Sequence, residues 1–247
     1  MAPKDMCVVI VVATDYDRDG LDQDRAAISE AFNASFEVKL VELIDENIKT
    51  VDDIFKSFAK DKEWLDEFEK CKFVAVFCMS HGQADGLIKL TTKNEVEDAG
   101  KTMKKINEVA DARRHLLCPL FKIKQLDSKL KWLVVQACRG ELNNYKPMQK
   151  DGEVKIPPKC FCISYCTAEG TISFQKGTGG KIYIQKLCAE IKKDIRGKNL
   201  CDILESVNTA VKEEFKTTQG SETYQNAHYV CDCPDYVFPD SSMSVEK

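Results

Sequence analysis

The chain has 247 residues, of which 43% are hydrophobic and 31% charged, a length and balance typical of a folded protein with a sizeable core and not of a disordered segment. Its net charge of −4 is mild and its basic residues are scattered among acidic ones, so neither nucleic acid nor a membrane surface is an expected partner. Twelve cysteines without a signal-peptide pattern predict a reducing, cytoplasmic location with mostly buried thiols.

Runs of apolar and β-branched residues predict six strands, and segments of helical periodicity lie between them. Leu21, Ile28 and Phe32 share one helix face, and Ile54, Phe55 and Phe58 share another in a helix with Thr50 as its predicted cap. The strands are expected at 7–13, 36–43, 73–79, 132–137, 160–166 and 228–233, with further helices at 182–191 and 200–215. Strands separated by helices predict an α/β fold with a mainly parallel sheet and helices on both faces.

Two stretches interrupt this alternation. Residues 93–114 are polar and predict a surface insertion that contains an amphipathic helix. Residues 141–158 contain Asn143-Asn144, Pro147, Asp151-Gly152 and Pro157-Pro158, which together predict an exposed loop.

The residues that indicate chemistry follow two neighbouring predicted strands. Gln136-Ala137-Cys138-Arg139-Gly140 ends one strand and Ser80-His81-Gly82 ends another, with His81 preceding Cys138 by 57 residues. Carboxyl ends of parallel strands meet at one rim of a sheet, where His81 could take the thiol proton of Cys138. The N–H groups of Gly82 and Cys138 could then hold an oxyanion. A packing cysteine and a structural histidine are the alternative, which the paired motifs outweigh.

These motifs resemble those of the caspase family, whose nucleophile lies in the same pentapeptide. Other segments extend the resemblance over nearly the whole chain: Arg18-Asp19-Gly20-Leu21-Asp22-Gln23-Asp24, Thr167-Ala168-Glu169-Gly170, Tyr183-Ile184-Gln185-Lys186-Leu187-Cys188 and Asn208. The resemblance implies a caspase-like three-layer fold with a six-stranded sheet. It also implies one catalytic domain over 1–247, with 1–140 as a large-subunit-like part, 141–158 as the intersubunit loop and 159–247 as a small-subunit-like part. No long prodomain is expected before it.

The resemblance further implies a pocket for an aspartate at the P1 position of a peptide substrate. Arg18 and Gln136 match two of the three side chains that bind this aspartate in caspases. Where the family has Ser-Trp-Arg, an ungapped alignment places Ser173-Phe174-Gln175, so that the arginine is replaced by Gln175. Lys176 follows, but in an extended segment its side chain points to the other face and lacks the arginine fork. We therefore expect a weakened pocket, with no metal and no cofactor.

Two functions follow from this combination. One is a caspase-type cysteine endopeptidase of low activity in apoptosis-related proteolysis, cleaving peptides and proteins after aspartate. The other is a decoy, a pseudoenzyme that binds and regulates an active caspase. A flavodoxin-like binding domain has little support, because no glycine-rich loop follows the first strand.

Processing and assembly also follow from the resemblance. Asp151 is the only aspartate in the intersubunit loop, and Lys150 before it predicts inefficient cleavage there. A second caspase chain is the expected partner, in a homodimer or heterodimer formed through the last strand. Asp232 would meet its own copy in a homodimer, which predicts a monomer in isolation and a heterodimer with a suitable partner.

Two cysteine pairs have a spacing that places both thiols on one strand face, namely Cys160 with Cys162 and Cys231 with Cys233. A zinc site there is a minor alternative, because the two-residue gap usual in structural zinc sites is missing. Most of the cysteines are therefore expected to serve as core side chains.

Overall fold

The computed structural model describes residues 4–15, 19–83, 86–94, 104–140, 154–171, 173, 179–219 and 225–240. Arg18, Phe174, Gln175 and Lys176 of the predicted pocket lie outside these described residues, as does Asp151 of the predicted intersubunit loop. The predictions made for those positions therefore rest on the sequence alone.

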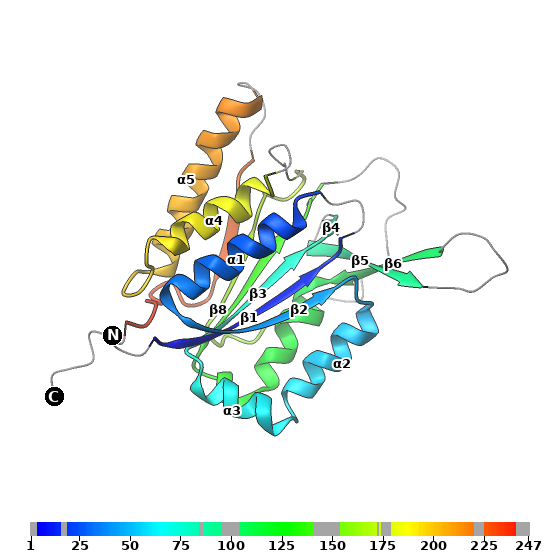
Figure 1. Cartoon of the computed structure of the whole chain (residues 1–247), viewed down its shortest axis with the longest axis vertical. Coiled ribbons are helices and arrows are strands. Elements are labelled where there is room, and N and C mark those ends of the chain that lie inside the picture. Colours follow the sequence, from blue (N-terminus) through cyan, green and yellow to red (C-terminus); the bar gives the residue numbers. More distant parts are fainter. Residues whose placement is uncertain are drawn as a thin grey trace.

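A six-stranded sheet forms the centre of the molecule, with the strand order β2-β1-β3-β7-β8-β9 (Figure 1). Its strands are β1 (Met6–Ala13), β2 (Glu37–Ile44), β3 (Phe73–Met79), β7 (Leu130–Gln136), β8 (Phe161–Tyr165) and β9 (His228–Cys231). All neighbouring pairs are parallel except β8 and β9. The six-stranded, mainly parallel sheet predicted from the sequence is confirmed.

Helices cover both faces of this sheet, as predicted (Figure 1). One face carries α1 (Leu21–Ser35), α4 (Ile182–Lys192) and α5 (Leu200–Gln219). The other carries α2 (Ile48–Phe58), α3 (Lys62–Lys70) and the short helices η2 (Arg113–Leu117), η3 (Cys118–Lys122) and η4 (Lys124–Leu126). None of the described helices is long and apolar enough to cross a membrane.

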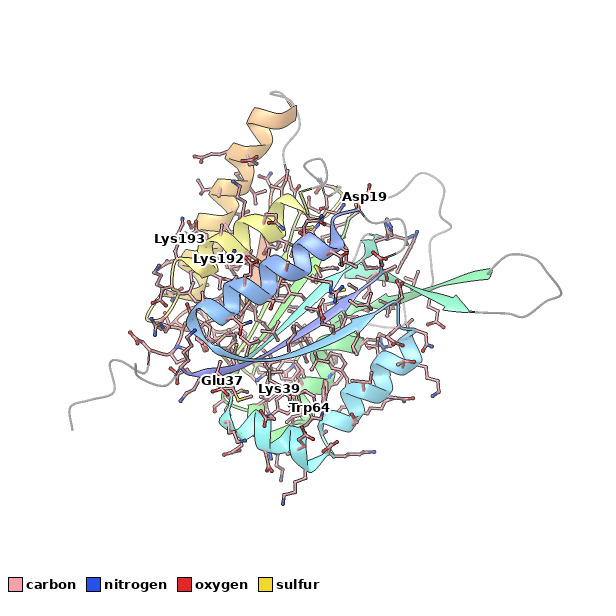
Figure 2. All side chains as sticks on the ribbon, viewed as in Figure 1. Asp19, Glu37, Lys39, Trp64, Lys192 and Lys193 are labelled. Carbon is pink, nitrogen blue, oxygen red and sulfur yellow. The ribbon has the colours of Figure 1, made fainter. Side chains whose placement is uncertain are left out.

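The alternation of side chains along each central strand produces two cores. Val9 and Val11 of β1 point toward α1 and α4, whereas Val8 and Ile10 point toward α2 and α3. Both sets are fully buried, which is why the strand reads as a continuous apolar run in the sequence. On the outer side of the second core, the ammonium of Lys39 lies over the ring of Trp64, 5.4 Å from its centroid (Figure 2).

Within the described part of 93–114, residues 104–111 form a strand of a second, three-stranded sheet, where an amphipathic helix was predicted. Its antiparallel strands are β4 (His81–Gly82), β5 (Leu87–Asn94) and β6 (Lys104–Asp111), and the β5–β6 hairpin projects from the rim of the large sheet (Figure 1). Ile88 pairs with Ala110, and both side chains are buried. The prediction was wrong because cross-strand pairing with β5 overrides the helix propensity of the Lys- and Glu-rich segment.

Three smaller differences concern element boundaries. Helix α2 is capped by Asn47, whose side chain accepts the N–H of Thr50 at 2.7 Å, so Thr50 lies in the first turn and is not the cap. Helix α3 was not predicted. Strand β9 ends at Cys231, two residues earlier than predicted, so the exposed Asp232 lies past the strand.

Candidate active site

The pairing of β3 with β7 sets His81 and Cys138 at the same level of the sheet rim. Met79 and Gln136 are partners at the carboxyl ends of these parallel strands, and the N–H of Ser80 donates to the carbonyl of Gln136 at 3.2 Å. His81 lies two residues after Met79 and Cys138 two residues after Gln136, and both residues are half-buried. The two residues therefore follow adjacent strand ends on one rim, as the sequence predicted.

Gly82 lies directly against the backbone that carries the cysteine. A Cβ atom built at this glycine would come within 2.5 Å of the Cys138 carbonyl oxygen and 2.6 Å of the Ala137 Cβ. Neither neighbour is the end of a flexible side chain, so no side chain fits at position 82. The close approach of the two segments thus explains why glycine follows the histidine.

The segment before His81 is anchored to the small sheet. His81 itself pairs with Lys89 of β5, and the hydroxyls of Ser80 and Thr14 both donate to the carbonyl oxygen of Lys89, from Thr14 at 3.3 Å. All three anchoring residues are buried. Sequence reasoning missed Thr14 and Lys89, because a bond to a backbone carbonyl across 75 residues leaves no sequence pattern.

Two residues of the predicted substrate pocket lie beside the thiol. The N–H of Ser173 donates to the Sγ of Cys138 at 3.4 Å, and the Nε2 of Gln136 donates to the Ser173 hydroxyl at 2.6 Å. The buried Gln136 and the half-buried Ser173 are thereby brought together with the cysteine. Of the residues predicted for substrate binding, these two are the ones that the structure describes.

Arg139 fixes the cysteine segment to the loop after β8. Its backbone N–H donates to the Thr171 carbonyl at 2.9 Å, its guanidinium forms an ion pair with Glu169, and its Cζ lies 3.9 Å from the ring centroid of Tyr165. Burial raises the pKa of the Tyr165 phenol, which therefore stays neutral under the cation. Glu169 carries a charge opposite to that of Arg139, and this is the signal in the sequence that could have revealed the pair.

Asp24 connects an N-terminal helix of the chain to a C-terminal one. Its buried carboxylate accepts the N–H of Lys181 and the Nε2 of Gln185, both at 2.9 Å. The bonds connect the first turn of α1 to the start of α4. The sequence showed these residues in two separate motifs, and their contact was not predicted.

Among the residues that the structure describes, no group of three His, Cys, Asp or Glu side chains is arranged to hold a metal ion. All twelve cysteines carry free thiols. At this rim, the thiol of Cys138 and the imidazole of His81 follow neighbouring strands. The N–H of Ser173 and the side chain of Gln136 lie beside the sulfur.

The six-stranded, mainly parallel sheet with helices on both faces is that of a caspase-like fold. A sequence model of the caspase domain matches residues 4–231, so the chain belongs to the caspase family. Caspase-3 of Bos taurus is 29% identical over 208 residues, 81% of this chain and 68% of that protein. Caspase-3 of Oryctolagus cuniculus is 29% identical over 84% of this chain and 70% of its own length. Caspase-1-A of Xenopus laevis is 23% identical over 68% of this chain and 45% of its length.

Proposed function

We propose that this chain is a caspase-type cysteine endopeptidase with Cys138 as nucleophile, His81 as general base and a weakened pocket for aspartate. The observation that carries the proposal is the register of β3 with β7, which sets the two residues at one level of the rim. The close packing of Gly82 on the cysteine segment and the Ser173 N–H at the sulfur support it. We further propose that it acts in the cytoplasm, in apoptosis-related proteolysis.

The chemistry follows from these positions. His81 accepts the thiol proton, and the Cys138 thiolate attacks the carbonyl carbon of the P1 residue. The N–H groups of Gly82 and Cys138 hold the oxyanion, each worth about 3–4 kcal/mol of transition-state stabilisation. His81 then protonates the leaving amine, and water hydrolyses the thioester that remains on Cys138.

Recognition is the weakened step of this proposal. Arg18 and Gln136 are proposed to bind the P1 carboxylate, with Ser173, Phe174 and Gln175 along the substrate backbone. Gln175 offers a neutral amide where caspases have an arginine, so one charge-assisted hydrogen bond is lost, at about 2–5 kcal/mol. The corresponding fall in kcat/KM is roughly 30-fold to several thousand-fold.

The test is a panel of tetrapeptide reporters that differ only at P1, assayed with the purified protein and with Cys138→Ala. We expect slow cleavage that is fastest after aspartate and is absent in the variant. A peptidyl fluoromethyl ketone ending in aspartate should alkylate Cys138 in the unsubstituted protein. Equal reporter rates for both proteins together with no alkylation would overturn the proposal.

A decoy that regulates an active caspase is the second candidate, and Gln175 is the observation that favours it. The edge strand β9, with Val230 48% exposed, offers a surface for a second caspase chain. The Cys138→Ala variant separates the two functions, because it cannot cleave. If it changes the kcat/KM of an added active caspase as strongly as the unsubstituted chain does, the decoy role is supported.

The division of the chain belongs to the same proposal. Residues 1–140 would form the large-subunit-like part, 141–158 the intersubunit loop and 159–247 the small-subunit-like part of one catalytic domain. Strand β8, which follows the loop, lies beside β7 in the same sheet and supports this division. Limited proteolysis should cut first between these two parts and leave them associated.

A further inference from the structure

Five of the twelve cysteines gather where β8 begins and β9 ends: Cys160, Cys162, Cys201, Cys231 and Cys233. Cys162 and Cys231 are direct partners in the antiparallel pairing of the two strands. Cys160 and Cys233 face each other two residues further along the same register, with their Sγ atoms 2.8 Å apart. None of these residues belongs to the site around Cys138.

The backbone holds Cys160 and Cys233 in this position from several sides. Between them, the N–H of Asp232 donates to the Phe161 carbonyl at 2.9 Å, which continues the ladder past the end of β9. The carbonyl of Cys160 accepts the N–H of Lys131 at 3.1 Å, and that of Cys233 accepts the N–H of Tyr236 at 3.0 Å. The pair is therefore fixed by bonds that do not depend on the thiols.

Cys160 adopts a backbone conformation that a residue with a side chain rarely takes. Its φ of +33° lies in the left-handed region, where a non-glycine residue is disfavoured. Such a conformation persists only where the surrounding structure enforces it, and here the result is a thiol facing Cys233. The strained residue is thus one of the two cysteines whose Sγ atoms lie 2.8 Å apart.

The two sulfurs have different acidities. The hydrogen bond between the two thiols lowers the pKa of Cys160, and the nearby ammonium of Lys131 adds to this effect. The hydrogen bonds with Cys160 and Cys231 raise the pKa of Cys233. Burial lowers the pKa of Lys131 to about 8, which leaves it mostly charged at neutral pH. A thiolate therefore forms more readily at Cys160 than at an ordinary cysteine.

We propose that Cys160 and Cys233 form an intramolecular disulfide when the protein meets a low-molecular-weight disulfide such as oxidised glutathione. The Cys160 thiolate attacks one sulfur of the small disulfide, forms a mixed disulfide and releases the first glutathione thiolate. Cys233 loses its proton and attacks the Cys160 sulfur, which releases the second glutathione. Two protein thiols are oxidised, and one small disulfide is reduced to two thiols.

The geometry favours this pair over the others. The sulfurs need to approach by less than about 1 Å to reach the bond length of roughly 2.05 Å. Both residues are half-buried, so a small oxidant can reach them, whereas Cys162 is fully buried. The hydrogen bond with Cys231 and burial both raise the pKa of Cys162, which keeps it a thiol. Oxidation would join the start of β8 to the segment after the edge strand β9.

The experiment uses the full chain with Cys138→Ala, so that the proposed nucleophile does not contribute to the thiol count. The protein is equilibrated with oxidised and reduced glutathione, quenched in acid, alkylated and mapped by mass spectrometry without reduction. One tryptic peptide contains both Cys160 and Cys162, and another contains both Cys231 and Cys233. Fragment ions and the single variants Cys160→Ser, Cys233→Ser and Cys231→Ser therefore make the assignment.

We expect the loss of two alkylatable thiols, a link between Cys160 and Cys233, and an increase in melting temperature of about 5 °C or more that dithiothreitol reverses. Cys160→Ser and Cys233→Ser should lose both effects, whereas Cys231→Ser, the matched control in the same cluster, should keep them. A link between any other pair, glutathione adducts without a link, or retention of every alkylatable thiol in strongly oxidising buffer would overturn the proposal. The disulfide map of the Cys138→Ala protein decides whether the link between Cys160 and Cys233 forms, even if a serine variant fails to fold.

Discussion

Gly82 shows how a single position without a side chain sets the geometry of the rim. We expect Gly82→Ala to reduce the free energy of unfolding by about 1–3 kcal/mol, because the new methyl group meets the Cys138 carbonyl and the Ala137 Cβ. Alkylation of Cys138 by the aspartyl probe should slow with it. Urea unfolding and probe kinetics measure the two effects.

Gly170→Ala is the matched control for this change. Gly170 has a φ of +79° but no heavy atom within 4 Å of an added Cβ, so alanine there meets only the backbone strain of about 1–2 kcal/mol. The two variants should therefore differ in how far they slow probe alkylation. Equal slowing by both would show that contact with the cysteine segment is not what glycine provides at position 82.

Position 175 tests whether recognition limits the proposed activity. Gln175→Arg should raise kcat/KM for aspartyl reporters tenfold or more, which corresponds to about 1.4 kcal/mol, because the arginine would bind both the carboxylate and the substrate backbone. Cys138→Ala in the same background should abolish the gain. If Lys176→Ala lowers the activity and Gln175→Arg leaves it unchanged, the cation is supplied by Lys176 and the aligned position is wrong.

At the scale of elements, Asp24 connects α1 to α4 through two hydrogen bonds to a buried carboxylate. Asp24→Ala should reduce the free energy of unfolding by about 2–4 kcal/mol, since it leaves the N–H of Lys181 and the amide of Gln185 without this acceptor. Asp22→Ala, two residues earlier on the same helix, is the control. Its side chain is 88% exposed and its pair with Arg25 should contribute less than about 1 kcal/mol. Similar losses in urea unfolding would refute the assignment.

The elements also differ in how well their sequences predict them. The strands β1 and β3 were predicted because both of their faces are buried, and a continuous apolar run of seven or eight residues is typical of such a strand. Strand β7 is buried on both faces too, and the apolar run 132–135 predicted it although Lys131 and Gln136 are polar. The β5–β6 hairpin was not, because its pairing depends on residues that are distant in the sequence. The residues of the site differ in the same way. Sequence motifs located His81 and Cys138. The roles of Thr14 and Lys89 and the pairing of Arg139 with Glu169 could not be predicted, because they depend on contacts between separate loops.

At the scale of the whole molecule, the end of β9 changes the expectation for assembly. Asp232 was expected to oppose self-pairing, and it is exposed directly after the last residue of β9, a position that favours a carboxylate facing solvent at the strand end. Strand β9 is the last strand of the sheet among the described residues, and its Val230 is 48% exposed. We therefore expect concentration-dependent dimerisation in sedimentation, weakened by Val230→Lys and unaffected by Asp232→Asn. A chain that stays monomeric at its highest soluble concentration would contradict this.

His81 lies between the large sheet and the small one, and this position has a mechanical consequence. It follows β3 of the large sheet and is itself a strand residue of the small one, paired with Lys89 of the projecting hairpin. Cys138, in contrast, follows a strand of the large sheet only. A displacement of β5 would therefore move the imidazole relative to the sulfur, and it would also move Ile88 and Leu90, which are buried in the core beside α2. A ligand bound to the β5–β6 hairpin would therefore change the position of His81 through its pairing with Lys89.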